Sequence, residues 1–527
     1  MTFKGNVFLS LILVALMSLS STSFASTHFN KQISEYNQYQ EFNWGQCPAQ
    51  FNTTDKQNKC SFAEVPLDWA DPIGKKIEVL VAKYPARGGV SKGQLWMISG
   101  GPGASASIAF PHVIEYDMAD IVEDHDVYII EHRGIGWSTE LQCDWRDYFN
   151  PQACFDAQHE IWGDGLFEFN TTNAARDLEY VISKSRALNW LPSYIYGVSY
   201  GTMLVQRFTQ IAPNGAQGII LDSVLPTTNF GADMYEENAD KVFTQLADYC
   251  DLDEYCRSKF VSPVNQTIRT TLTDHFAGQH CSDVSIDREK LQLWSMEQIS
   301  RNDKRALLPF YSRLARCNAD DIVALKKAVT FYKLGGSTFI LRQENNVPDE
   351  FKATFSGPLY DLISMNEINL VKRSVDQRRL FCTNAVVCFT LADHALSAKY
   401  QSTWSERYIG EYIYKRMRHY MPLIAFNGTL DHATPIFHAK AIESSFTNIN
   451  QRFIEVPYAP HGVVFNTGVK TAGEGICGVD IMESFMENPW TKPNTDCLND
   501  LTDHTFKLAI EHSQEVYGED DAFGSFK

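Results

Sequence analysis

The chain has 527 residues, of which 44% are hydrophobic and 21% are charged, and its formal net charge is -18 at pH 7. This length predicts two or three structural units with a large hydrophobic core. The negative charge argues against binding to nucleic acid or to anionic membranes. We therefore expect a globular protein that uses neither as a partner.

The N-terminus has the pattern of a secretory signal peptide. Lys4 precedes an apolar run over residues 7–19, and small residues follow up to Ala25. The run is 13 residues long, whereas a membrane-spanning helix needs roughly 20. We expect residues 1–25 to be removed and the mature protein to be secreted or periplasmic, with no stable membrane association.

Twelve cysteines follow the signal peptide, and their even number in an exported chain predicts disulfide bonds. The connectivity does not follow from the sequence, but pairing of neighbours is the simplest arrangement. No histidine shows metal-ligand spacing beside a cysteine pair, so no metal site is expected. The cysteines are Cys47, Cys60, Cys143, Cys154, Cys250, Cys256, Cys281, Cys317, Cys382, Cys388, Cys477 and Cys497.

The first part of the chain alternates between strand and helix patterns. Strands are predicted over residues 76–83, 94–98, 126–131, 194–196 and 218–224, and a helix over residues 174–186 with Asn173 as its cap. The run 218–224 is apolar throughout, as in a strand buried on both faces. This alternation predicts an α/β domain with a mostly parallel sheet, whose chemistry lies at the carboxyl ends of the strands.

The clearest motif is Gly-Val-Ser-Tyr-Gly over residues 197–201, where a predicted strand gives way to a predicted helix. A serine at the apex of such a sharp turn needs residues without side chains two positions before and two positions after it. Gly197 and Gly201 meet that need. The motif therefore predicts a nucleophile elbow that presents the Ser199 hydroxyl above the sheet.

Residues 226–420 change character and read as mainly helical, with six of the cysteines. Strand patterns resume at 422–426 and 452–456. We expect an α/β core formed by residues 26–225 and 421–527, with a disulfide-bearing C-terminal tail. The helical segment 226–420, called the cap below, should cover the carboxyl edge of the sheet and control access and specificity.

The two resumed strands are each followed by a candidate catalytic residue, Asp431 and His461. The order Ser199, Asp431, His461 is that of the α/β-hydrolase triad, in which the imidazole takes the serine proton and the carboxylate orients the imidazole. Asp222, which also ends a strand, is the alternative acid. His432 is the alternative base, although a neighbour of the acid at a strand end usually points elsewhere.

Two backbone N–H groups are candidates for an oxyanion hole. One belongs to Tyr200, directly after the nucleophile. The other belongs to Gly101, in the Ser-Gly-Gly-Pro-Gly loop over residues 99–103, where glycine lets the backbone approach a ligand closely. A triad with two backbone donors needs no cofactor for acyl transfer, so none is expected.

These motifs together resemble the prolyl aminopeptidase and tripeptidyl aminopeptidase family of α/β-hydrolases, and the Ser-Tyr-Gly-Thr form is closer to the exported tripeptidyl branch. The likeness extends from about residue 60 to 500. The motifs are Gly-Gly-Pro-Gly at 100–103, Glu-His-Arg-Gly-Ile-Gly-Trp-Ser at 131–138, Asn-Thr-Thr at 170–172, the elbow at 197–202, Asp431 with Thr434 and Pro435, and the tail with Cys477 and Cys497.

The resemblance implies a serine exopeptidase that releases residues or short peptides from a free N-terminus. Such an enzyme needs a carboxylate for the protonated α-amine of its substrate. Similar chains often carry a Cys-x-acid motif in the cap, and the nearest match here is Met365-Asn366-Glu367, without the cysteine. Glu367 is therefore the candidate amine ligand, and the alternative is a solvated surface glutamate.

Two other functions use the same fold. An esterase or lipase needs the same triad under a cap that accepts an apolar group. A catalytically silent binding protein usually loses a triad member, whereas this chain keeps all three candidates. Haloalkane and epoxide hydrolases are excluded because they have Asp in place of Ser199.

Overall fold

The computed structural model describes the chain between residues 42 and 525, apart from residues 49–57, 145, 146, 148, 190, 229, 262, 336–353, 411, 414, 418, 471–474 and 503. The predicted signal peptide, residues 1–25, lies outside this part. Within it, no helix is both long enough and apolar enough to cross a membrane.

In the described residues, nine strands form one sheet in the order β1-β2-β3-β5-β4-β6-β7-β8-β9. The strands from β5 to β9 in this order pair in parallel, whereas β1, β2 and β3 pair antiparallel with one another and β3 with β5. Their bounds are β1 Gly45–Gln46, β2 Lys59–Pro66, β3 Lys76–Tyr84, β4 Gly93–Ile98, β5 His125–Ile130, β6 Ser193–Val198, β7 Gly218–Asp222, β8 Leu423–Gly428 and β9 Gln451–Val456.

Every predicted strand is present, with ends shifted by a few residues at most. Strands β1 and β2 were not predicted. In β2 exposed and buried side chains alternate only over residues 61–65, and Cys60 and Ser61 are both buried. The strand therefore lacks the regular alternation by which a strand is predicted from sequence.

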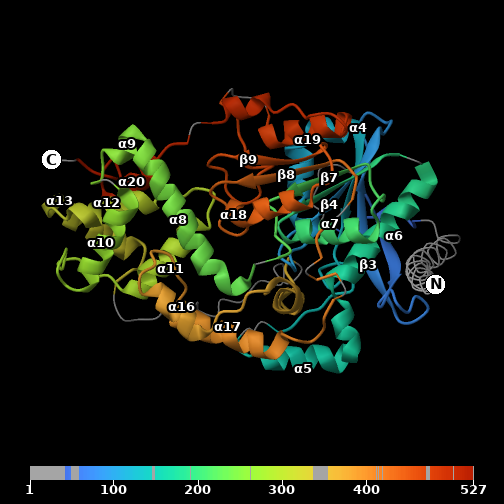
Figure 1. Ribbon diagram of the computed structural model, residues 1–527, viewed down its shortest axis with the longest axis horizontal. Helices are drawn as coiled ribbons and strands as arrows, with labels where there is room; N and C mark the ends of the chain where they lie inside the picture. The colour runs from blue at the N-terminus through green and yellow to red at the C-terminus, as the bar shows by residue number, and fades with distance from the viewer. Residues whose placement is uncertain are drawn as a thin grey trace, which may run out of the picture.

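Helices cover both faces of the sheet. Leu95 and Met97 of β4 pack in one cluster with α3 (Pro111–Tyr116), α4 (Ala119–Asp124) and α19 (Cys477–Glu487). Trp96 and Ile98 point the other way, toward α6 (Thr171–Asn189) and α7 (Tyr200–Ile211). Figure 1 shows α4 and α19 along one side of the strands. This three-layer arrangement is the α/β-hydrolase fold expected from the alternating pattern.

The helix predicted over residues 174–186 is longer than expected. It begins at Thr171, so Asn173 lies inside the first turn and is not its cap. The side chain of Asn170 accepts a hydrogen bond from the Asn173 N–H at 2.9 Å instead. The polar run Asn-Thr-Thr-Asn offers several capping residues, and the structure selects the first.

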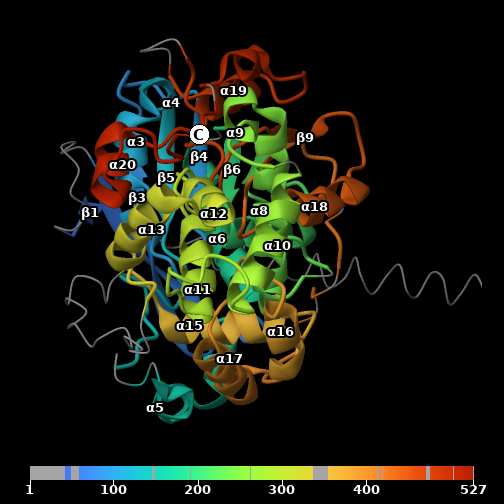
Figure 2. The same cartoon turned by 90° about the vertical axis from the view of Figure 1, so that its left-hand side faces the viewer.

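The cap segment lies between β7 and β8, and its described residues are mainly helical. Figures 1 and 2 show its helices gathered at one end of the sheet. The described helices are α8 Tyr235–Leu252, α9 Glu254–Arg257, α10 Val264–Phe276, α11 Arg288–Ile299, α12 Leu307–Arg316, α13 Ala319–Phe331, α15 Gly357–Ile363, a π-helical turn Ser364–Ile368, α16 Val375–Cys382 and α17 Leu391–Trp404.

The cap meets loops at the carboxyl ends of three strands. The Ser356 N–H donates to the Gly103 carbonyl, after β4, at 2.8 Å. Tyr249 donates to the Thr429 hydroxyl, after β8, at 2.8 Å, and Asn302 donates to Asn466, after β9, at 2.9 Å. The cap therefore lies over the edge where the candidate site residues are found.

The C-terminal residues pack with the cap, although the sequence assigned residues 421–527 to the core. Val516, Tyr517 and Phe523 are buried in the same cluster as the cap helices. Arg313 of α12 donates to the Ala522 carbonyl at 2.6 Å and pairs with Glu519 at 3.0 Å. Figure 1 shows α20 (Ile510–Tyr517) among the cap helices. This contact joins segments about 200 residues apart, and no local sequence pattern predicts it.

All twelve cysteines are described, and they form six disulfides between sequence neighbours, as predicted. The pairs are Cys47–Cys60, Cys143–Cys154, Cys250–Cys256, Cys281–Cys317, Cys382–Cys388 and Cys477–Cys497. Three of them lie in the cap. Each closes a loop of at most 36 residues, so the bridges fix local geometry and do not tie the cap to the core.

Candidate active site

Ser199 stands at a sharp turn between β6 and α7. Its backbone has φ 58° and ψ -123°, a conformation that L-residues rarely adopt and that often marks a functional site. A Cβ atom at Gly197 would lie 2.6 Å from the Gly201 carbonyl oxygen, and one at Gly201 would lie 2.6 Å from the Ile98 carbonyl oxygen. Both glycines are therefore required for the turn, and the elbow predicted from the sequence is present.

Asp431 and His461 lie next to each other after β8 and β9. Nδ1 of His461 is 3.0 Å from both carboxylate oxygens of Asp431. The same carboxylate accepts the backbone N–H groups of Ala433 and Thr434, each at 2.9 Å, and the Thr434 hydroxyl at 2.8 Å. These bonds orient the carboxylate toward the imidazole.

This pairing shifts both pKa values. Burial raises the pKa of Asp431, but the nearby His461 and the hydrogen bonds outweigh burial, and the net effect is a pKa below the ordinary value. Burial lowers the pKa of His461, but the Asp431 carboxylate outweighs it, and the pKa of the imidazole is raised. Asp431 is thus a permanent anion that strengthens His461 as a base.

Asp222, the alternative acid, holds the loop that carries His461. One carboxylate oxygen accepts the Val463 N–H at 2.7 Å, and the other accepts the Val464 N–H at 3.0 Å and the Tyr196 hydroxyl at 2.8 Å. Its backbone carbonyl accepts the Ser199 N–H at 2.9 Å. Asp222 therefore joins the serine turn to the His461 loop, and the imidazole is bound by Asp431.

His432, the alternative base, faces the cap. Its ring centroid is 6.1 Å from that of His461 and 5.9 Å from that of Tyr235 on α8. Burial lowers the pKa of His432 to about 3, so this imidazole is neutral at physiological pH. Buried Lys304 lies in the same electrostatic surroundings, and burial lowers its pKa to about 8. The sequence analysis did not single out Tyr235 or Lys304, because nothing local marks cap residues that reach this edge.

The glycine loop after β4 packs directly against the serine. A Cβ atom at Gly100 would lie 2.9 Å from Ser199 Cβ and 3.3 Å from its hydroxyl oxygen. Gly101 has φ 107°, which requires glycine. The loop is anchored on the other side by Glu131, which accepts the Ser107 N–H at 2.8 Å and whose pKa burial raises to about 7. The N–H groups of Gly101 and Tyr200 thus belong to segments that adjoin Ser199.

Glu367 is buried, so it is not a solvated surface residue. It lies in the π-helical turn of the cap, and one carboxylate oxygen accepts the Tyr408 hydroxyl at 2.7 Å and the Thr171 N–H at 2.9 Å. The other oxygen pairs with Arg207 of α7 at 3.5 Å. Because Thr171 and Tyr200 also share a hydrogen bond at 3.0 Å, Glu367 is linked to the elbow.

The structure places one histidine beside a cysteine pair, which the sequence analysis did not anticipate. Among the described residues, Cys382, Cys388 and His394 have ligand atoms that all lie within 4.8 Å of one another. The histidine follows the second cysteine by six residues on the next helix, and the turn between them could not be read from the sequence. The two sulfurs form a disulfide, as expected.

Comparison with protein families agrees with the fold. A model of the alpha/beta hydrolase fold family matches residues 95–346. This range contains most of β4, the glycine loop, the elbow and much of the cap.

Comparison with characterised proteins finds the tripeptidyl aminopeptidases of Streptomyces lividans and Streptomyces coelicolor, each 29% identical over 210 residues. The match covers 34% of this chain and 38% of each relative, so the chain spans about two fifths of the relatives' length. The resemblance predicted from the motifs is thereby confirmed.

Comparison with solved structures matches an esterase from Exiguobacterium antarcticum that is 11% identical, with a TM-score of 0.31. The match covers 73% of this chain and 90% of the esterase chain. A thermophilic esterase from Thermogutta terrifontis is also 11% identical, with a TM-score of 0.30. This match covers 76% of this chain and 91% of the esterase chain. At this level of similarity neither structure bears on the activity.

Proposed function

We propose that this chain, which has the α/β-hydrolase fold and is similar in sequence to tripeptidyl aminopeptidases, is an exported serine aminopeptidase. The observation that carries the proposal is the linkage through Asp222: its backbone binds Ser199, and its side chain binds the loop of His461, which is itself paired with Asp431. This linkage supports a triad made of a strained serine, a base with a raised pKa and a buried carboxylate at one edge of the sheet.

In the proposed mechanism, the Ser199 hydroxyl attacks the carbonyl carbon of the scissile peptide bond while His461 takes its proton. The Asp431 carboxylate stabilises the imidazolium that forms. The N–H groups of Tyr200 and Gly101 stabilise the negative oxygen of the tetrahedral intermediate. His461 then donates its proton to the leaving amine, and water hydrolyses the acyl-enzyme by the same route in reverse.

Glu367 is the proposed carboxylate for the substrate's free amine. Its place in the cap and its link to the elbow through Thr171 support this role. Both of its oxygens already have partners, so an ammonium group would have to join or replace one of them, for example the Tyr408 hydroxyl. Asp361 of α15 is a second buried carboxyl six residues earlier, and burial raises its pKa well above the ordinary value. Because a raised pKa favours the neutral carboxyl, Asp361 is less suited than Glu367 to bind an ammonium group.

Export is part of the proposal. Six disulfides are typical of proteins that fold in an oxidising compartment. The signal-peptide pattern of residues 1–25 also supports export. Whether the protein remains in the periplasm or reaches the medium is decided by fractionating the culture.

The test compares three substrates: a tripeptide chromogenic amide with a free N-terminus, its N-acetylated form and a short-chain nitrophenyl ester. The proposal predicts cleavage of the free peptide and a large loss on acetylation. Glu367→Gln should raise KM for the free peptide and leave ester turnover near wild type. The matched variant Asp361→Asn, which also removes a buried cap carboxyl, should leave KM near wild type. Ester turnover without peptide cleavage would make the protein an esterase and overturn the proposal.

A further inference from the structure

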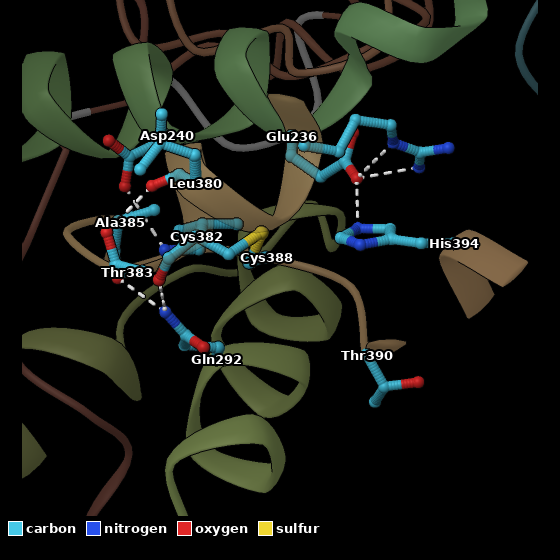
Figure 3. The surroundings of a disulfide bond; sticks show 12 residues. Glu236, Asp240, Gln292, Leu380, Cys382, Thr383, Ala385, Cys388, Thr390 and His394 are labelled. Atoms are coloured by element: carbon cyan, nitrogen blue, oxygen red, sulfur yellow. Dashed lines mark hydrogen bonds and ion pairs between the residues drawn. A yellow bond between two sulfur atoms is a disulfide. The ribbon is translucent and has the colours of Figure 1, made fainter. Parts of the chain in front are cut away.

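The cap contains a buried cluster of potential metal ligands away from the candidate active site. Figure 3 shows the Cys382–Cys388 disulfide at the end of α16, with the His394 imidazole of α17 beside it. The two sulfurs and one imidazole nitrogen all lie within 4.8 Å of one another. Cys388 and His394 are fully buried, and Cys382 is 9% exposed.

The orientation of His394 leaves one nitrogen without a partner. Nε2 lies 2.7 Å from a carboxylate oxygen of Glu236 on α8. Because a carboxylate only accepts hydrogen bonds, Nε2 carries the proton of this bond, and in the neutral imidazole Nδ1 presents a lone pair. Nδ1 is buried and has no hydrogen-bond partner among the residues that the structure describes. A buried acceptor in this state is rare and requires an explanation.

Glu236 is arranged as the outer partner of a metal-binding histidine. One of its carboxylate oxygens lies 2.7 Å from His394 Nε2. Arg378 donates to the same oxygen at 2.6 and 2.9 Å, which neutralises the charge. Histidines that bind metals usually donate their other N–H to such a carboxylate, which fixes the tautomer.

We infer that the dithiol form of this cluster binds one Zn²⁺ through Cys382, Cys388 and His394 Nδ1. A dithiol reductant opens the disulfide by giving it two electrons and two protons, and becomes a disulfide itself. Zn²⁺ then displaces the two thiol protons and forms two Zn–S bonds and one Zn–N bond. Two thiolates and a dication are neutral together, which suits a buried site. Solvent supplies a fourth ligand.

The loop between the cysteines is held independently of the disulfide. Asp240 accepts the N–H groups of Val386 and Val387 at 2.8 and 3.1 Å. Gln292 donates to the carbonyls of Cys382 and Ala385 at 2.7 and 2.8 Å. The loop therefore keeps its place when the sulfur–sulfur bond opens.

The same loop has an exposed side and an inner side. Thr383 and Asn384 are exposed, so a small reductant and the metal can approach Cys382. Phe389, directly after Cys388, stacks on Tyr235 with a centroid distance of 5.8 Å. The proposed metal site is thus connected to His432 through Phe389 and Tyr235.

The test treats the folded, full-length protein with dithiothreitol, counts the opened cysteines by alkylation and mass spectrometry, and then adds Zn²⁺. We expect one equivalent of Zn²⁺ per chain and protection of Cys382 and Cys388 from alkylation by at least about tenfold. Co²⁺ in place of Zn²⁺ should give a thiolate charge-transfer absorption. The untreated protein should give neither result.

Two variants separate this site from general thiol binding. His394→Gln keeps an amide donor for Glu236 but has no imidazole, and it should lose the protection. The Cys250→Ser and Cys256→Ser double variant removes a disulfide of the same sequence separation, six residues. This variant should keep the protection of Cys382 and Cys388 by Zn²⁺. Equal protection in His394→Gln and wild type, no protection by Zn²⁺, or a Cys382–Cys388 bond that stays closed would each overturn the inference.

Discussion

The carboxyl edge of the sheet and the cap both join residues that are far apart in sequence, but they do so in different ways. At the edge, Asp222 binds Val463 and Val464 across about 240 residues. Asp222 ends β7 and the two valines follow β9, and both strands belong to the parallel part of the sheet. In the cap, Glu236 binds His394 across 158 residues through the packing of α8 against α17. Strand order dictates the first contact, whereas only side-chain packing dictates the second.

This difference explains why polar side chains have different tasks in the two regions. At the edge they orient Ser199 and His461, so their loss should reduce turnover more than stability. In the cap, polar side chains form hydrogen bonds with backbone groups of loops and so hold the loops in place. Their loss should therefore reduce stability more than turnover. Each prediction below tests one side of this comparison.

The largest effect is expected at the nucleophile. Ser199→Ala removes the attacking hydroxyl but keeps the backbone turn, so kcat should fall by up to about a millionfold, as in other serine hydrolases. Peptide hydrolysis should be measured together with the melting temperature, which should remain near wild type. Residual turnover close to wild type would remove Ser199 from the mechanism.

The next effect is expected at the acid. Asp431→Asn should lower kcat by about ten thousandfold, since the imidazole loses its orientation and its counter-charge. The Asp431 carboxylate raises the pKa of His461. In wild type the neutral base therefore appears only as the pH rises through a midpoint above about 6.5, the ordinary value for histidine.

The pH profile of kcat/KM checks the sign of this shift. Activity should fall on the acid side in wild type, and the midpoint should move to lower pH in Asp431→Asn because the raising charge is lost. The opposite displacement, or none, would show that Asp431 does not act on His461.

A smaller effect is expected at Asp222. Asp222→Asn weakens hydrogen bonds from two backbone N–H groups to a charged acceptor, worth about 1.5–3 kcal/mol, and displaces the loop of His461. We expect kcat to fall by about ten- to a hundredfold, with KM little changed.

The matched control is Asp240→Asn, because Asp240 also accepts two consecutive backbone N–H groups, but in the cap. It should lower the melting temperature and leave kcat near wild type. A similar loss of kcat in both variants would abolish the distinction between the two regions.

The smallest effects are expected at two glycines. A Cβ at Gly201 would meet two backbone oxygens of the β4 end at 2.6 and 2.7 Å, so Gly201→Ala should destabilise by about 1–3 kcal/mol or more. A Cβ at Gly357, the first residue of α15 in the cap, would meet nothing within 4 Å. Gly357→Ala should therefore stabilise by about 0.4–1 kcal/mol. Thermal unfolding of both variants measures the contrast. A change in stability of the same sign in both variants would contradict it.

The sequence by itself determined the α/β core, the elbow, and the place of Asp431 and His461 directly after two strands. These features depend on local rules: a period of two in strands, glycine at a strained turn, and polar residues directly after buried strands. Because the carboxyl ends of parallel strands share one edge, the order of strands was enough to predict that these residues meet.

Only the tertiary structure decided the rest. It gave Asp222 the task of holding the His461 loop, buried Glu367 against Arg207, and packed Tyr517 and Phe523 of the C-terminal segment with the cap. It also brought His394 to the Cys382–Cys388 bridge. Each of these contacts depends on how helices pack side by side, and an amphipathic helix specifies which face is buried but not which neighbour covers it.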